Sequence, residues 1–198
     1  VSGIDAFCQA IESIWATGSN EESTNYAEES AALSYNNLLT AVSCPDAESR
    51  RNLSRASNLA GKAINISRTT APHAVSYTMT SVYGIPHGQA VCITLGEFLK
   101  YISEVTEDDC NDRRGAEHVR NAVRRILRIL NAKDPEEGRG KINALIEDCG
   151  LQTTLTGLGI NGMKEIEQIA LNTNAERLGN NPRKITQDKL LEIMKRVH

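Results

Sequence analysis

The sequence predicts an all-α protein, a single bundle of about eight to ten helices that spans residues 1–198. Two observations lead to this fold class. Apolar residues recur with helical spacing in most segments, and no segment shows the apolar–polar alternation of a strand. The length of 198 residues is sufficient for one substantial core. Helices are expected at roughly 4–15, 21–42, 47–66, 71–83, 87–101, 116–130, 135–149, 163–171 and 187–197.

Several of these helices carry recognisable start signals. Ser19 with Glu22 has the pattern of a capping box for the second helix. Asp46 is a good N-cap for the third, and Thr70 for the fourth, whose first turn contains a proline. Asp134, followed by proline and two acidic residues, marks another start. The helix at 87–101 is apolar on nearly every side, so we expect it in the middle of the bundle.

Composition excludes several classes of function. The net charge is −3 and aromatic residues are 4 % of the chain, which argues against nucleic-acid binding. No apolar run reaches the roughly 18–20 residues that span a membrane. Five scattered cysteines without a CxxC pair predict reduced thiols and a cytoplasmic location. The chain starts with Val1 rather than methionine, so we expect it to be part of a longer chain.

Four polar residues are candidate metal ligands. Asp5 and Gln9 are four residues apart on one helix, and His73 and His87 flank a helix–turn–helix segment. A carboxylate, an amide oxygen and two imidazoles suit Fe(II), Zn or Mn. Spacing alone does not establish that the four groups meet. The alternative is that each histidine is a hydrogen-bonded core or capping residue.

Three motifs resemble one known family. Ser2–Glu12, the segment from Pro72-His73-Ala74 to Gly84-Ile85-Pro86-His87-Gly88, and the C-terminal Asn181–Thr186 are similar to the helical domain of iron-containing (group III) alcohol dehydrogenases. The resemblance implies the dehydroquinate synthase-like helical fold of that domain. It also implies that Asp5, His73 and His87 bind a metal.

The sequence departs from the family at two positions. Gln9 stands where the family usually has a histidine ligand, and Tyr77 stands where it often has another histidine. The resemblance implies metal binding for the first position and a catalytic hydrogen bond to substrate for Tyr77. An Asp–Gln pairing is similar to a branch that resembles phosphonoacetaldehyde reductases.

That branch draws attention to a basic segment before His73. Lys62 and Arg68, with Asn65 between them, occupy positions where the broader family commonly has an apolar residue at the first and a glycine at the second. If they face the cleft, they are predicted to bind the phosphonate of a substrate, with Arg68 suited to two-pronged contacts. The alternative is that they are ordinary exposed residues.

The resemblance implies an enzyme, an alcohol dehydrogenase or aldehyde reductase that uses Fe(2+) or Zn(2+) and NAD(P)H. No GxGxxG turn is present, so the cofactor is expected to bind mainly to an N-terminal nucleotide-binding domain absent from this chain, and the fragment alone should be inactive. The substrate would be a small aldehyde, phosphonoacetaldehyde first. Two alternatives are a general short-chain alcohol dehydrogenase domain and a non-catalytic assembly domain that has lost its metal. A homo-oligomer is compatible with the sequence but not required by it.

Overall fold

A computed structural model describes residues 1–198 of the chain. Ten α-helices and one short 3-10 helix make up the fold, which has no strand, and the predicted all-α class is confirmed. The elements are α1 (Ser2–Trp15), α2 (Glu21–Ser43), α3 (Ala47–Ser67), α4 (Ala71–Tyr83), α5 (His87–Ser103), α6 (Ala116–Ile129), α7 (Pro135–Asp148), η1 (Thr156–Leu158), α8 (Met163–Leu171), α9 (Ala175–Leu178) and α10 (Gln187–Arg196).

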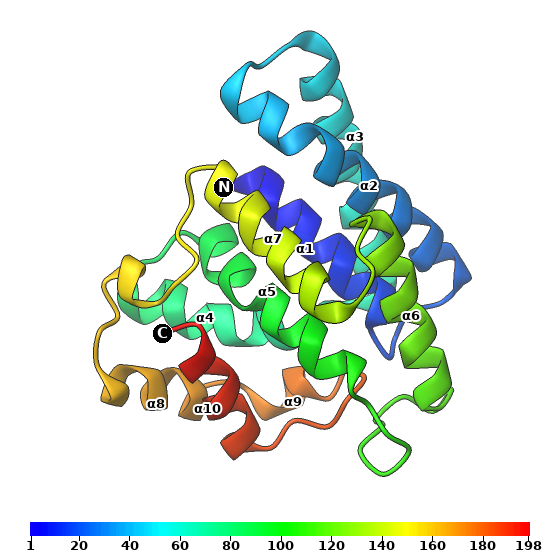
Figure 1. Cartoon of the computed structure of the whole chain (residues 1–198). Coiled ribbons are helices and arrows are strands. Elements are labelled where there is room, and N and C mark those ends of the chain that lie inside the picture. Colours follow the sequence, from blue (N-terminus) through cyan, green and yellow to red (C-terminus); the bar gives the residue numbers. More distant parts are fainter.

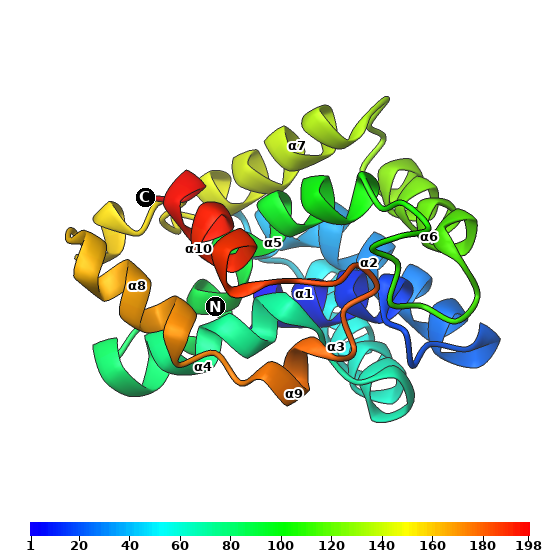
Figure 2. The same ribbon diagram turned by 90° about the horizontal axis from the view of Figure 1, so that it is seen from below.

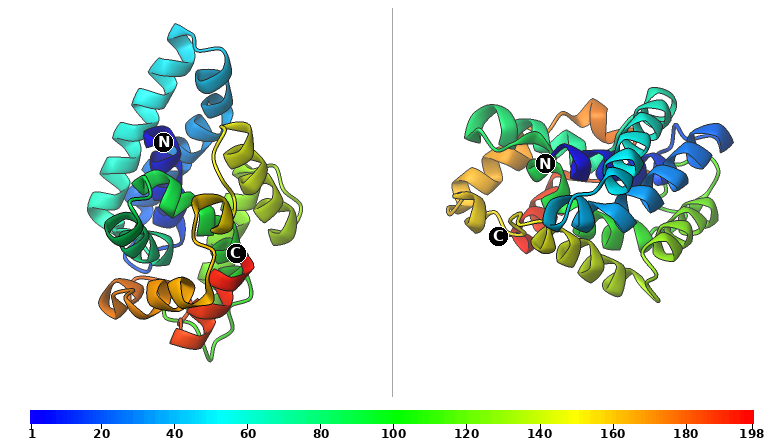
Figure 3. Two further views of the ribbon diagram at one scale, coloured as in Figure 1. Left: turned by 90° about the vertical axis from the view of Figure 1, so that its left-hand side faces the viewer. Right: turned by 90° about the horizontal axis from the view of Figure 1, so that it is seen from above.

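Helix α1 lies in the interior of the molecule (Figure 1). It contacts the α2–α3 hairpin as well as α5 and α6. Phe7 and Ile11 on α1 are completely buried. The α2–α3 hairpin projects at one end of the molecule, while α8, α9 and α10 gather at the other end (Figure 3). The metal ligands predicted on α1 are therefore carried by a helix that is fixed by neighbours on several sides.

Helix α5 is the second central element, as its apolar sequence predicted. It contacts α1, α4, α6, α7 and α10, and Figure 2 shows it between α7 and α4. Its apolar side chains join those of α1 in one core of 43 buried residues. None of the helices has both the length and the apolar character that would let it cross a membrane.

Two helix starts differ in how they compare with the capping residues expected from the sequence. The capping box predicted from Ser19 and Glu22 is wrong, because Asn20 is the N-cap and exchanges hydrogen bonds with Ser23. The Ser19 side chain is engaged elsewhere, since its hydroxyl oxygen accepts a 3.1 Å hydrogen bond from Arg114. The Asp46 cap is confirmed, with a 2.6 Å bond from the Ser49 amide to its carboxylate.

The four-residue helix α9 was not predicted. It is shorter than the window over which helical periodicity is detectable. Its first turn is held by Asn174, whose side-chain oxygen accepts a 2.8 Å hydrogen bond from the Glu176 amide. This short element matters because it carries a residue that lines the candidate site.

Candidate metal centre

Three helix starts place the candidate ligands. Asp5 lies in the first turn of α1, His73 in the first turn of α4, and His87 is the first residue of α5. Helix α4 ends at Gly84 in the left-handed conformation, with φ 68°, and this allows a three-residue turn into α5. The rings of His73 and His87 consequently meet edge to face, with 5.3 Å between their centroids. The two histidines that are fourteen positions apart thus face one another.

The donor atoms of these residues converge. Asp5 Oδ1 lies 3.5 Å from His73 Nε2 and 3.8 Å from His87 Nε2, and the three ligand atoms are all within 4.8 Å of one another. His73 is 3 % exposed, and neither its Nε2 atom nor Asp5 Oδ1 has a hydrogen-bond partner. Buried polar atoms without a partner are costly unless something satisfies them. One carboxylate and two imidazoles suit a divalent transition metal, so the residues present fit the metal that the sequence predicts.

Glu12 fixes the orientation of His73. One oxygen of its fully buried carboxylate pairs with His73 Nδ1, and the other accepts hydrogen bonds of 2.7 Å and 2.8 Å from the amide and hydroxyl of Thr70. Trp15 Nε1 donates to the same Thr70 hydroxyl at 2.9 Å. A carboxylate on Nδ1 keeps the proton there and leaves Nε2 available as a ligand. Thr70 begins α4 as predicted, but its hydroxyl binds Glu12 instead of capping the helix.

The same carboxylates change the protonation of His73. Burial by itself would lower the pKa of His73, but the charges of Glu12 and Asp5 and their contacts with the ring outweigh burial and raise the pKa to about 9. A metal ligand must be a neutral imidazole, so metal binding would release the proton from Nε2.

Gln9 contacts Asp5 directly. Its side-chain amide donates a 2.9 Å hydrogen bond to Asp5 Oδ2, the carboxylate oxygen other than the one that faces the histidines. The predicted i, i+4 pair on α1 is therefore a physical contact that orients Asp5. A direct bond from Gln9 to a metal remains a prediction.

A cleft of about 330 Å³ opens over two of the three candidate ligands, His73 and His87. It is lined by Gln9, Ile64, Arg68, Thr69, His73, Tyr77, His87 and Arg177. Tyr77 lies one turn after His73 on α4, is 41 % exposed, and has its ring 5.7 Å from that of His87. Lys62 and Asn65 are exposed on α3 and do not line this cleft. The Lys62 ammonium instead lies 5.5 Å from the ring of Tyr26.

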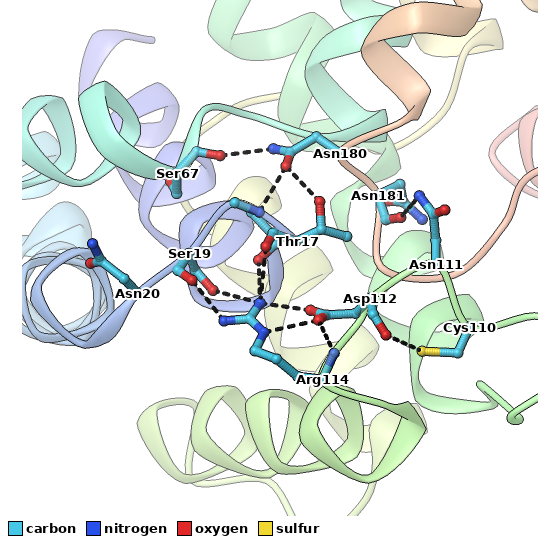
Figure 4. Close-up of polar contacts among 12 residues, drawn as sticks. Thr17, Ser19, Asn20, Ser67, Cys110, Asn111, Asp112, Arg114, Asn180 and Asn181 are labelled. Atoms are coloured by element: carbon cyan, nitrogen blue, oxygen red, sulfur yellow. Dashed lines mark hydrogen bonds and ion pairs between the residues drawn. The ribbon is translucent and has the colours of Figure 1, made fainter.

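Arg68 has an unusual backbone. It ends α3 with φ 59° and ψ 176°, a region that is essentially restricted to glycine. The side-chain amide of Asn180 donates a 2.9 Å hydrogen bond to the carbonyl of Ser67 (Figure 4). It donates another of 2.9 Å to the carbonyl of Thr69, so it binds both sides of Arg68. The Asn180 side-chain oxygen accepts from the hydroxyl of Thr17 and the amide of Gly18. The surrounding structure thus holds an arginine in a conformation that it would not adopt unaided.

Gly18 allows the α1–α2 loop to pack closely against the turn at Arg68. A Cβ atom at Gly18 would lie 2.9 Å from the Ser67 carbonyl oxygen, so no other residue fits without displacing the turn. Arg114 in turn fastens the α1–α2 loop, with a 3.0 Å hydrogen bond to the carbonyl of Ala16 and two bonds to Asp112 (Figure 4). Three loops distant in sequence therefore determine the position of Arg68.

Arg177 is a cleft residue that the sequence analysis missed. Its guanidinium carbon lies 4.3 Å from the centre of the Tyr77 ring. It follows Asn174 on the short helix α9, and no motif or periodicity in that segment marks it. Glu12 was recognisable, because it is seven residues after Asp5 and shares its helix face.

The fold and the clustered ligands agree with the comparison to known families. A family model described as the Fe-containing alcohol dehydrogenase family, C-terminal, matches residues 1–198. The chain belongs to this family, and the resemblance found in the sequence is confirmed.

Two relatives are named for different compounds, phosphonoacetaldehyde and 1,3-propanediol. A phosphonoacetaldehyde reductase of Streptomyces viridochromogenes is 34 % identical over 149 residues, which are 75 % of this chain and 38 % of the relative. A 1,3-propanediol dehydrogenase of Klebsiella pneumoniae is 26 % identical over 198 residues, 98 % of this chain and 49 % of the relative. The chain thus spans half or less of the length of these relatives.

Solved structures share the fold. A sulfoacetaldehyde reductase from Bifidobacterium kashiwanohense in complex with NAD+ superposes with a TM-score of 0.80 at 28 % identity, covering 98 % of this chain and 48 % of that one. An archaeal alcohol dehydrogenase from a Red Sea brine pool reaches a TM-score of 0.85 at 21 % identity, covering 99 % of this chain and 49 % of that one. The second likeness supports the fold alone.

Proposed function

We propose that this chain is the metal-binding catalytic part of an NAD(P)-dependent oxidoreductase that reduces a small aldehyde to an alcohol. The observation that carries the proposal is the convergence of Asp5, His73 and His87, with two buried ligand atoms lacking partners. The two histidines also line an open cleft. Membership of the iron-containing alcohol dehydrogenase family supports it.

In the proposed reaction, a hydride passes from the nicotinamide of NAD(P)H to the carbonyl carbon, and a proton is added to the carbonyl oxygen. An iron or zinc ion held by Asp5, His73 and His87 supplies Lewis-acid chemistry at that oxygen when bound. Glu12 keeps His73 in the tautomer that exposes Nε2, and Gln9 holds the other oxygen of Asp5.

Tyr77 is proposed to position the substrate. Its partly exposed side chain projects into the cleft from the same helix as His73 and lies beside His87. A phenol hydroxyl donates and accepts hydrogen bonds, so Tyr77 is suited to orient the carbonyl group over the ligands.

The cofactor is proposed to bind mainly outside this chain. The chain spans half or less of the length of its relatives, and one of these, the sulfoacetaldehyde reductase, is described in complex with NAD+. Two-domain enzymes commonly place their substrates at the seam between domains. In this arrangement a nucleotide-binding domain holds NAD(P)H, and this chain provides the metal and substrate cleft.

The substrate is proposed to carry an anionic group, with phosphonoacetaldehyde as the first candidate. Arg68 lines the cleft beside the metal ligands and is held there in a strained backbone conformation. Two of the relatives are named for aldehydes with phosphonate and sulfonate groups. The second candidate is a neutral short-chain aldehyde, which the propanediol dehydrogenase relative favours.

The test uses the full-length protein, supplied with iron or zinc and with NADH or NADPH. We expect turnover of phosphonoacetaldehyde to exceed that of propionaldehyde. Arg68→Ala should lower kcat/KM for the anionic aldehyde about 10–100-fold, the effect of a charge-assisted contact, and affect propionaldehyde little. An equal loss on both aldehydes would remove the anionic substrate from the proposal, and absence of any aldehyde reduction would contradict the enzymatic function.

A further inference from the structure

We propose that Arg177 and Arg68 together form an anion subsite beside the metal ligands, with Arg177 as a specificity-determining residue. This inference rests on the proposed function, because it names the substrate group that the same cleft recognises. It begins from the shape of the cleft. A second cavity of about 370 Å³ adjoins the first, and Arg68, Thr69 and Arg177 line both.

The position of Arg177 relative to the metal ligands is set by stacking. Its guanidinium lies over the Tyr77 ring at 4.3 Å, and the Tyr77 ring lies 5.7 Å from that of His87. Stacking on the face of an aromatic ring restricts a guanidinium while its N–H groups, which lie in its own plane, stay available. Arg177 is therefore held one ring away from a candidate ligand, with donors free to bind substrate.

Both cations lack anionic partners. The guanidinium groups of Arg68 and Arg177 make no hydrogen bond, and no carboxylate lies within the 4.0 Å of an ion pair. Arg114 and Arg183, in neighbouring loops, do form ion pairs with aspartates. The single carboxylate among the lining residues is Glu176, which lines the second cavity and not the one over the ligands. The cavity over the ligands thus carries two unneutralised positive charges, and a phosphonate or sulfonate would satisfy both.

The backbone segments that carry Arg68 and Arg177 are joined by hydrogen bonds. Asn174 accepts hydrogen bonds from the amides of Glu176 and Arg177, which fixes the start of α9. Three residues after Arg177, Asn180 binds the carbonyls on both sides of Arg68. The segment that carries one arginine therefore also holds the backbone of the other, and the spacing between the two backbone positions is built into the fold.

The arrangement assigns a direction to the substrate. The carbonyl end would face Asp5, His73 and His87, while the anionic tail would lie between Arg68 and Arg177 near Thr69. A neutral aldehyde would leave both arginines without a partner. Selectivity for an anionic aldehyde should therefore depend on Arg177 as much as on Arg68.

The test compares Arg177→Gln and Arg177→Lys with the wild-type full-length protein. Arg50→Gln, at an exposed position near the start of α3, serves as the control for loss of a surface charge. Three quantities are measured: kcat and KM for phosphonoacetaldehyde and propionaldehyde, KM for NAD(P)H, and binding of ethylphosphonate by calorimetry after removal of metal. The last measurement needs no catalysis and no metal, so it separates the subsite from the proposed function.

We expect Arg177→Gln to lower kcat/KM for phosphonoacetaldehyde about 10–100-fold, mainly through KM, and to weaken ethylphosphonate binding by a similar factor. Propionaldehyde and NAD(P)H should change by less than about 3-fold, and Arg177→Lys should recover part of the loss. Equal losses on both aldehydes, an effect confined to KM for NAD(P)H, or unchanged ethylphosphonate binding would each overturn the proposal. If no aldehyde is reduced but ethylphosphonate binding still depends on Arg177, the subsite stands and the reductase function fails.

Discussion

The strained backbone at Arg68 provides a test that separates conformation from charge. Arg68→Gly and Arg68→Ala both remove the guanidinium, but only glycine relieves the positive φ of 59°. Alanine keeps a Cβ atom, and the Asn180 bonds to the Ser67 and Thr69 carbonyls hold the turn in place. The difference in stability between the two variants therefore reports the backbone strain, less the stability that glycine loses through the freedom of the unfolded chain.

The expected magnitude follows from two opposing effects. A non-glycine residue in this region is strained by about 1–3 kcal/mol. Glycine gives back roughly 0.5–1 kcal/mol through the greater freedom of the unfolded chain. Arg68→Gly should thus be about 1–2 kcal/mol more stable than Arg68→Ala, and in a chain of this size each kcal/mol raises Tm by about 2–4 °C.

The assay is urea unfolding of the 198-residue chain, followed by circular dichroism, together with aldehyde kinetics of the full-length protein. Both variants should lose selectivity for phosphonoacetaldehyde to the same extent, although their stabilities differ. If Arg68→Gly were no more stable than Arg68→Ala, the strain at Arg68 would be refuted. Stability gained together with lost selectivity is the signature of a residue retained for function.

Three further predictions concern the residues around the site. The pKa of His73 rises from 6.5 to about 9 on folding, so the protonated ring stabilises the metal-free folded chain by about 3 kcal/mol below pH 6.5. This contribution to the free energy of unfolding should be lost as the pH rises through 9. Urea unfolding across this range checks it, and an unchanged slope in His73→Gln would contradict it. Glu12→Gln removes the carboxylate charge that pairs with His73 Nδ1 and should weaken metal binding about 10-fold or more. Competition with a chelator measures the metal affinity, and an unchanged affinity would show that Glu12 does not orient His73. Asn180→Ala should destabilise the chain by about 1–3 kcal/mol and lower selectivity for the anionic aldehyde, because it frees the Arg68 turn. Lost stability with full selectivity would mean that Asn180 does not position Arg68.

Much of the fold could be predicted because it depends on local patterns. The apolar stripe of α1 and the apolar sequence of α5 indicated both helices, and the apolar character of α5 on nearly every side also indicated its central place. The Ser19–Glu22 capping box failed because Asn20 caps the helix and Arg114, distant in sequence, binds the Ser19 hydroxyl, a contact that local patterns do not contain.

The site was predictable only where chemistry and helical spacing coincide. Asp5, His73 and His87 are residue types that bind metals, and the family motifs connected them. Arg177 could not be found, since α9 is four residues long and its role depends on stacking over Tyr77. Lys62 was predicted near the substrate from the branch resemblance, with an ordinary exposed position as the alternative, and in the structure its ammonium lies near the Tyr26 ring.

The central claim is that Asp5, His73 and His87 bind one metal ion, and the metal content of the full-length protein tests it most directly. We expect about one iron or zinc per chain in the wild type, loss of the metal in His73→Ala and in His87→Ala, and retention in the control His118→Ala, which lies outside the site. An intact protein without bound metal, or metal retained in both site variants, would contradict the account and favour a non-catalytic helical domain.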